Sequence, residues 1–377
     1  RATTARARRQ PRQRGGDVIP PRHAAPVAAP HAAGANNVTR VMLWVSAALL
    51  PATLFGFWLY GWPAIHLWWI TTASAILGEA FCLRLRQEPV ASTLRDGSAL
   101  LTGWLLALSL PPWAPWWVGV VGGLFATVIG KQVFGGLGQN LFNPAMVARV
   151  MLLISFPVPM TLWTAPVPLL SANAPGFVDG LRITSGTLPA TLDAMSSATL
   201  FGYARSELSR GIDLLQSLAA TQAPTLSLLG ERAGSLGETA SLLIAAGGLL
   251  LLGLRLITWH IPFAMLATLA LFASLMHGID PARYLSVGTH LLSGAAMLGA
   301  FFIATDYVTS PNTAPGQLVF GAGVGFLTYV IRTWGGYPEG VAFAVLLMNA
   351  LTPVIDRYLK PRIYGRDRRG TPLEIES

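Results

Sequence analysis

The chain has 377 residues, of which 53% are hydrophobic and only 11% are charged. A soluble globular chain carries roughly 25% charged residues, so this deficit and the repeated apolar runs predict a membrane protein with many spans. The net charge of +9 comes from basic residues at the two ends and in short loops, without a basic patch interleaved with aromatic residues, which argues against nucleic-acid binding.

Several kinds of site are excluded by residue counts and spacing. The single cysteine, Cys82, excludes an iron–sulfur cluster held by this chain alone and an intramolecular disulfide. The six histidines are scattered without an H-x-x-H or H-x-x-x-H pair, so we expect no metal site. A GxxxxGK[ST] sequence is lacking, which argues against ATP as the energy source.

In chain order, residues 1–40 are rich in Arg, Ala and Pro and are interpreted as a disordered basic cytoplasmic arm rather than a signal peptide. Membrane helices 1–5 are expected within 41–161, a polar region follows at 162–238, helices 6–10 are expected within 239–355, and a basic tail occupies 356–377. The ten apolar segments lie at about 41–60, 64–83, 98–111, 114–130, 144–161, 239–254, 259–276, 285–304, 317–331 and 340–355. The predicted fold is therefore an all-α polytopic membrane protein of about ten helices.

The distribution of Lys and Arg predicts the orientation of these helices. With the N-terminus in the cytoplasm, nineteen of them fall inside and six outside, and Arg149 is left within a span. This excess predicts cytoplasmic N- and C-termini and a polar region at 162–238 outside the membrane on the opposite side. Arg149 is expected to extend its guanidinium toward the cytoplasmic interface.

Two segments predict a five-plus-five inverted repeat. VGVVGGLFATVIGK (118–131) and VFGAGVGFLTYVIR (319–332) align without gaps, and Lys131 falls on Arg332. Each follows a Pro-containing polar stretch and precedes a Gly-Gly pair. In the count above they are segments four and nine, which cross the membrane in opposite directions, and binding sites of such folds lie where broken helices meet.

The cytoplasmic loop GKQVFGGLGQNLFNPAM (130–146) is the first candidate ligand site. Its glycines allow a positive φ and close approach to a planar or anionic ligand, and they are Gly135, Gly136 and Gly138. Asn140 and Asn143 add amide groups, and Asn143 is placed to cap the helix that begins at Pro144. The alternative is a tight re-entrant turn without a ligand.

Asp306, in ATDYVTSPNTAPG (304–316), directly follows an apolar span on the same cytoplasmic face. A carboxylate there is costly unless it is paired or functional, so it is either a ligand group or an acid that ends a helix in a short loop.

The stretch DAMSSATLFG (193–202) lies in the polar region. From propensity alone, Asp193 caps a short helix with Ser196 in its first turn.

These motifs, with DGSALLTGWLLALSLPP (96–112), resemble those of the D subunit of the bacterial Rnf electron-transport complex, and the resemblance extends from about Pro30 to the C-terminus. It implies a Thr that carries FMN through a phosphoester bond, attached by a flavin transferase outside the cytoplasm. That residue is Thr199, in a motif formed here by Asp193, Ser196, Ser197 and Ala198. Ser197 replaces the Gly that is common in flavinylated proteins.

The same resemblance implies an unlinked flavin, riboflavin in the relatives, among the helices toward the cytoplasm, with Asn140 and Asn143 holding its ring. The implied function is electron transfer between the ferredoxin and NAD couples, coupled to Na⁺ or H⁺ translocation. The implied partners are the A, B, C, E and G types of Rnf subunit. The implied location is a bacterial inner membrane, with residues 162–238 in the periplasm. The flavin would carry the redox chemistry, and the ferredoxin and NAD sites would lie on other subunits.

Two alternatives remain open at this point. The chain could be the B subunit of a sodium-pumping NADH:quinone reductase, which shares these motifs more loosely. It could also be a solute channel or transporter with the same inverted repeat and no redox chemistry.

Overall fold

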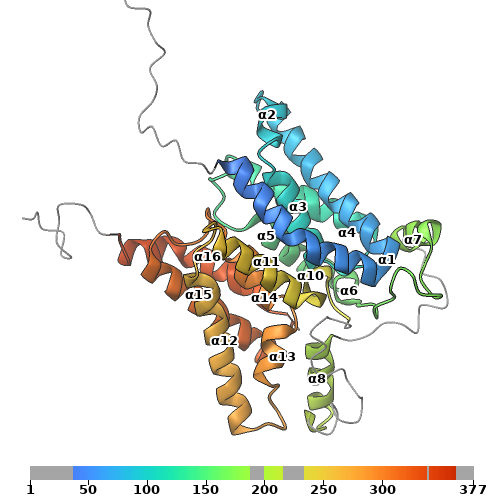
Figure 1. Cartoon of the computed structure of the whole chain (residues 1–377), viewed down its shortest axis with the longest axis vertical. Coiled ribbons are helices and arrows are strands. Elements are labelled where there is room, and N and C mark those ends of the chain that lie inside the picture. Colours follow the sequence, from blue (N-terminus) through green and yellow to red (C-terminus); the bar gives the residue numbers. More distant parts are fainter. Residues whose placement is uncertain (1–36, 187–198, 215–232, 338, 362–377) are drawn as a thin grey trace, which may run out of the picture. The chain divides into compact units, whose positions relative to one another are not determined.

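The computed structural model describes residues 37–186, 199–214, 233–337 and 339–361, and these form helices joined by loops (Figure 1). The first half contains α1 (Val38–Leu85), α2 (Val90–Leu94), α3 (Ser98–Ser109), α4 (Trp116–Leu124), the π-helix η1 (Phe125–Ile129), the 3-10 helix η2 (Gln132–Phe134), α5 (Pro144–Ser155) and α6 (Pro157–Thr161). Then follow α7 (Phe177–Thr184), α8 (Leu200–Ser209), α10 (Leu236–Thr239), α11 (Ser241–Gly253), α12 (His260–Ile279), α13 (Val287–Leu292), α14 (Ala296–Leu298), the π-helix η4 (Gly299–Ile303), α15 (Ala314–Trp334) and α16 (Val341–Tyr358).

The predicted helical class and multi-pass character are confirmed for this part of the chain. Five helical segments are long and apolar enough to cross a membrane: Val38–Leu85, Trp116–Phe134, His260–Ile279, Ala314–Trp334 and Val341–Tyr358. Apolar helices too short for that criterion are α3, α5 and α11. Each predicted apolar segment coincides with one or more helices, but ten membrane crossings stay a prediction.

The first two predicted segments are the two helical parts of α1, which meet at a sharp kink at Gly61, whose φ of 69° and ψ of −157° are not helical. A kink leaves backbone carbonyls without their helical partners, and such groups must be satisfied at membrane depth. The Tyr60 carbonyl accepts from the Trp113 indole at 3.0 Å, and the Trp58 carbonyl accepts from the Leu169 amide at 2.7 Å. The segment after α6 therefore helps to stabilise the kink.

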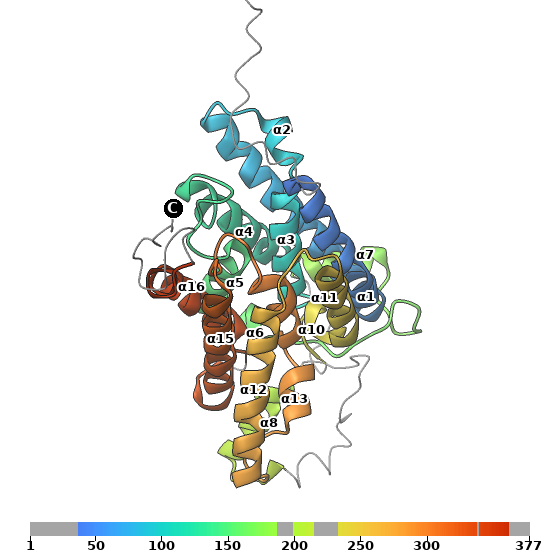
Figure 2. The ribbon, with the colours of Figure 1, turned by 60° about the vertical axis from the view of Figure 1, so that its left-hand side comes forward.

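Small residues allow the long helices to approach closely. A Cβ on Gly123 of α4 would lie 2.6 Å from the Thr71 carbonyl of α1, and one on Gly321 of α15 would lie 2.6 Å from the Ile261 carbonyl of α12. Backbones this close are typical of helix packing in membranes, where dispersion contacts rather than water exclusion hold helices together. Figures 1 and 2 show α12 beside α15 in both views.

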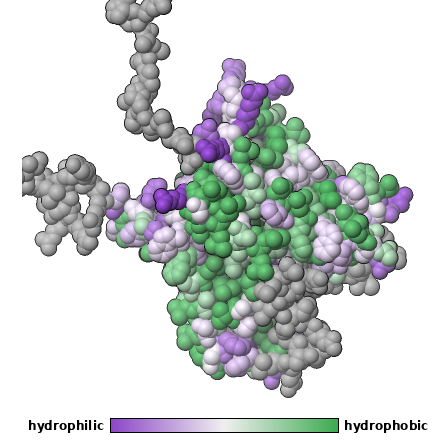
Figure 3. Space-filling view, in the orientation of Figure 1, coloured by the Kyte–Doolittle hydropathy of each residue, from purple (hydrophilic) through white to green (hydrophobic). Residues whose placement is uncertain are grey.

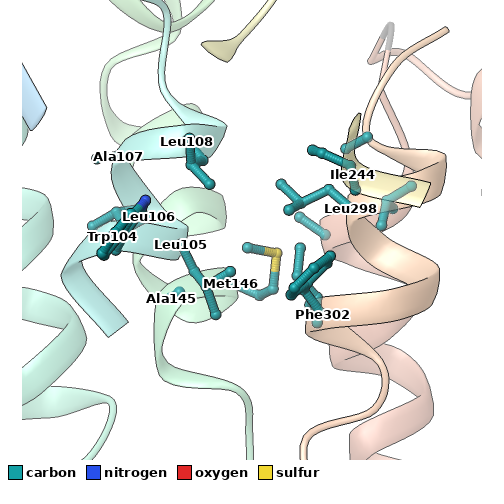
Figure 4. Packing of buried hydrophobic residues seen from close by; sticks show 14 of the residues in the cluster. Trp104, Leu105, Leu106, Ala107, Leu108, Ala145, Met146, Ile244, Leu298 and Phe302 are labelled. Atoms are coloured by element: carbon teal, nitrogen blue, oxygen red, sulfur yellow. The ribbon is translucent and has the colours of Figure 1, made fainter. Parts of the chain in front are cut away.

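One large apolar cluster joins the first-half helices to the second-half helices. In Figure 4, Leu105 of α3 and Met146 of α5 face Ile244 of α11 and Leu298 and Phe302 of the α14–η4 segment. Hydrophobic residues cover most of the visible face in Figure 3, while hydrophilic residues gather at the end that carries α2. This distribution fits a lipid-facing belt with a polar end.

Candidate functional site

A cavity of about 100 Å³, with a mostly apolar wall and several polar side chains, lies where the 130–146 loop meets the segment that contains Asp306. Its polar side chains come from three separate parts of the sequence: Ser98, Thr102, Lys131, Asn140, Asn143, Thr305 and Asp306. Its aromatic side chains are Phe301, Phe302 and Tyr307. Both π-helices end at this cavity, since η4 contains Phe301 and Phe302, and η1 is followed two residues later by Lys131. Such distortions occur often at functional sites.

The loop has the geometry that its glycines predict. Gly135, Gly136 and Gly138 adopt φ values of 117°, 99° and 89°, so the expectation of positive φ is confirmed. These three glycines do not line the cavity. From the same part of the loop, Leu137, Asn140 and Asn143 line it.

The two asparagines have different local roles. Asn143 caps α5, because its Oδ1 accepts from the Met146 amide at 3.3 Å and Pro144 occupies the first helical position, as predicted. The Asn140 amide nitrogen donates to the Phe142 carbonyl at 3.1 Å. Both side chains are buried and line the cavity.

The Asp306 carboxylate lines the same cavity and also hydrogen-bonds within the turn that follows it. It accepts from the Val308 amide at 3.3 Å and from the Thr309 hydroxyl at 3.1 Å. Burial raises the pKa of Asp306, while these two hydrogen bonds and the charge of Lys131 act in the opposite direction. The structure thus brings together Asn140, Asn143 and Asp306, which are 166 residues apart at their extremes in the sequence.

Lys131 is a cavity residue that the sequence reasoning missed. Its Nζ lies 2.8 and 2.9 Å from the two carboxylate oxygens of Glu79 and 2.6 Å from the Ser98 hydroxyl, and the Lys131 and Glu79 side chains are each 2% exposed. The Gln132 amide also donates to Glu79 at 2.9 Å. The sequence did contain one indication of this pair. Glu79 is an acid within an apolar segment, and a carboxylate there requires a buried partner.

Arg149 corrects one expectation. Its side chain does not reach the interface but is buried, with the residue 5% exposed, and its Nη1 has no hydrogen-bond partner among the described residues. Sequence position alone could not reveal this, because α5 is enclosed both by α3, α4 and η1, which precede it, and by α16 near the end of the chain.

Thr199 lies within the polar region 162–238, at the N-terminus of α8. It is the N-cap of this helix, and its hydroxyl oxygen accepts from the Gly202 amide at 3.2 Å. The remaining motif residues, Asp193 and Ser196 to Ala198, lie outside the described residues. The prediction that Asp193 caps a helix therefore lies outside the described residues. The N-cap of α8 is Thr199.

The fold and these sites define a helical, multi-pass membrane protein that has a cavity with several polar side chains and a separate helix capped by a threonine. The sequence model of the NQR2, RnfD, RnfE family matches residues 26–365, so the chain belongs to that family, as the motifs predicted.

Its relatives include proteins named as the D subunit of an ion-translocating oxidoreductase complex. The one from Halorhodospira halophila is 54% identical over 351 residues, which cover 93% of this chain and 98% of the relative. The one from Stutzerimonas stutzeri is 55% identical over 338 residues, covering 90% and 95%. The one from Escherichia coli O17:K52:H18 is 46% identical over 351 residues, covering 90% and 98%.

Proposed function

We propose that this chain is the D-type membrane subunit of an ion-translocating electron-transport complex and carries FMN on Thr199. The complex would transfer electrons between the ferredoxin and NAD couples and move Na⁺ or H⁺ across a bacterial inner membrane. Its partners would be the A, B, C, E and G types of subunit. High identity over nearly the full length of relatives with this name supports the subunit assignment.

The position of Thr199 is the observation that supports the flavin attachment. The hydroxyl oxygen accepts one hydrogen bond at the start of α8, so its own proton is not used in that bond. The first-turn amides of a helix and its dipole stabilise a bound phosphate, and a phosphoester on Thr199 would carry its negative charge at this position.

The attachment requires a flavin transferase and FAD. The Thr199 oxygen forms a bond to the FMN phosphorus as the pyrophosphate bond of FAD breaks, AMP leaves, and the hydroxyl proton is released. When bound, the flavin supplies the electron-carrying chemistry, and the chain holds it in place.

The cavity around Asn140, Asn143 and Asp306 is our proposed site for a second, unlinked flavin such as riboflavin. Amide groups and a carboxylate can hydrogen-bond to ring nitrogens and carbonyl oxygens, and Phe301 and Phe302 offer aromatic contact. At about 100 Å³ the cavity is smaller than the roughly 300–1,000 Å³ of pockets that take drug-sized ligands. Tyr307, which is 57% exposed, is a wall residue that can move to admit a ring.

An inverted repeat and cytoplasmic termini are part of the same proposal. Lys131 and Arg332, which align in the sequence, each form a buried ion pair with a glutamate, Glu79 or Glu339. Each also hydrogen-bonds to the residue beside a glycine of positive φ: Lys131 to Ser98 after Gly97, and Arg332 to Ser293 before Gly294. Those glycines precede the short helices α3 and α14, which supports equivalent positions in two repeats.

In-gel flavin fluorescence under denaturing conditions tests the attachment. The chain from a host with flavin transferase should give a fluorescent band, and Thr199→Ala should lose it. Thr313→Ala is the matched control, because Thr313 is also an N-cap that accepts from the amide three residues on, yet it should keep the band. Mass spectrometry of the peptide that contains Thr199 should find the added mass of FMN.

The absence of a band from the wild type, or its survival in Thr199→Ala, would overturn the flavin assignment and favour a non-redox transporter. The matching family also includes NQR2 proteins. Copurification with quinone-reductase subunits instead of Rnf-type subunits would identify the chain as the B subunit of that enzyme.

A further inference from the structure

A second pocket, of about 60 Å³, lies between α8 and the membrane helices, a few residues from Thr199. In Figures 1 and 2, α8 lies beside α13, and the Leu214 amide just after α8 donates to the Ala282 carbonyl at 2.9 Å. The wall residues that matter here are aromatic or cationic: Phe201, Arg205, Arg283, Tyr284, His290 and Arg332.

Arg332 forms the rigid floor of this pocket. Its guanidinium donates to the His290 carbonyl at 2.7 Å and to the Ser293 carbonyl at 3.2 Å, and it pairs with Glu339 at 2.9 Å. Its guanidinium carbon lies 4.5 Å from the centre of the Phe201 ring, a cation–π contact that joins α8 to α15. Because Glu339 balances its charge, Arg332 fixes the position of the Phe201 ring and adds little net positive charge to the pocket.

Arg205 and Arg283 supply the net positive charge. The Arg205 guanidinium donates to the Arg332 carbonyl at 2.9 Å and lines the pocket, so α8 is held to α15 at two points. Burial lowers the pKa of Arg205 from its usual range, but an arginine stays charged at neutral pH. Arg283 lies exposed at the rim of the pocket.

His290 provides a hydrogen-bonding atom that the protein leaves unused. The residue is 3% exposed, and its Nδ1 has no hydrogen-bond partner within the described part of the chain. A buried polar atom without a partner is costly, and this one belongs to a residue that lines the pocket. The pocket thus combines an aromatic wall, positive charge and an unused polar atom.

We propose that this pocket receives the pyrimidine end of the flavin ring carried by Thr199. Phe201 is only two residues beyond Thr199 at the start of α8, within reach of a ring joined through a phosphate and a five-carbon chain. The carbonyl-rich end of the ring matches the positive charge of Arg205 and Arg283, whereas its dimethylbenzene end does not. The small volume suits one end of the ring rather than the whole flavin.

This inference rests on the attachment proposed above, and its test has a readout other than activity. The purified complex, from a host with flavin transferase, is compared as wild type, Arg205→Gln, Phe201→Leu and Arg210→Gln. Arg210 is the matched control, since it caps the same helix, carries the same charge, has a side chain that is 67% exposed and pairs with Glu207. The measurements are in-gel flavin fluorescence, quenching of the covalently bound flavin's fluorescence by neutral acrylamide, and its reduction potential.

With the ring in the pocket, quenching in the wild type is weaker than for free FMN in buffer. Arg205→Gln and Phe201→Leu keep the fluorescent band but raise the quenching constant toward that of free FMN. Arg205→Gln also shifts the reduction potential to a more negative value, because a positive charge near the ring is lost, whereas Arg210→Gln matches the wild type in both.

Each other result overturns a distinct claim. If all variants are flavinylated but the wild type is quenched like free FMN, or Arg205→Gln and Arg210→Gln behave alike, the pocket assignment is wrong and the attachment stands. If the wild type carries no covalent flavin, the proposed function fails first and this inference fails with it.

Discussion

The buried ion pair between Lys131 and Glu79 offers the sharpest test of how the first-half helices are held together. Lys131→Met removes the cation and leaves the Glu79 carboxylate, whose side chain is 2% exposed, with only neutral partners. Breaking a buried pair from one side costs about 3–5 kcal/mol, because the remaining charge is uncompensated. With an unfolding entropy of roughly 2 cal/mol/K per residue, this corresponds to a loss of about 4–6 °C in Tm.

Thermal unfolding of the detergent-solubilised complex, followed by tryptophan fluorescence, measures this loss. Adding Glu79→Gln to Lys131→Met should recover much of it, since the second change removes the stranded charge. The exposed pair between Arg182 and Asp179, with side chains 68% and 57% exposed, is the control, and Arg182→Met should cost under about 1 kcal/mol. The reasoning is refuted if Lys131→Met melts like the wild type, or if Glu79→Gln lowers the Tm of the single variant further.

Two further predictions concern packing and capping. Gly123→Ala should destabilise the protein by about 1–3 kcal/mol, because the added Cβ meets the Thr71 carbonyl. Gly278→Ala is the control, and it should be neutral or slightly stabilising because the space around Gly278 is open. Equal Tm values for the two variants would contradict the described packing. Asn143→Ala should lower stability by about 1 kcal/mol through loss of the α5 cap, and should also release the unlinked flavin. Asn140→Ala should release that flavin with a smaller loss of Tm, and retention of full flavin content in acid extracts of both variants would remove them from the proposed site.

Much of the architecture was predictable because its signals are local. Apolar runs locate the helices, Pro144 after Asn143 marks the start of α5, and the three loop glycines indicate backbone of positive φ. Each of these signals depends on residues a few positions apart. The family followed from three motifs, and the comparison with known proteins confirmed it.

Other parts of the fold could not be predicted in this way. The kink that divides α1 at Gly61 is stabilised by Trp113 and Leu169, which satisfy carbonyls more than fifty residues away in the sequence. A helix kink therefore requires partners that the local sequence does not contain. The buried position of Arg149 likewise depends on the helices that enclose α5.

The composition and periodicity of the sequence by themselves determined a helical membrane protein with a polar region between two sets of apolar segments. Local motifs determined which asparagines, carboxylate and threonine to examine. Only the tertiary structure decided that Lys131 joins the cavity of Asn140 and Asp306 and pairs with Glu79, 52 residues away, and that Arg332 lies over Phe201. The physical reason is that a buried charge is stabilised by whichever opposite charge the packed helices bring within about 3 Å, and sequence periodicity carries no information about that distance.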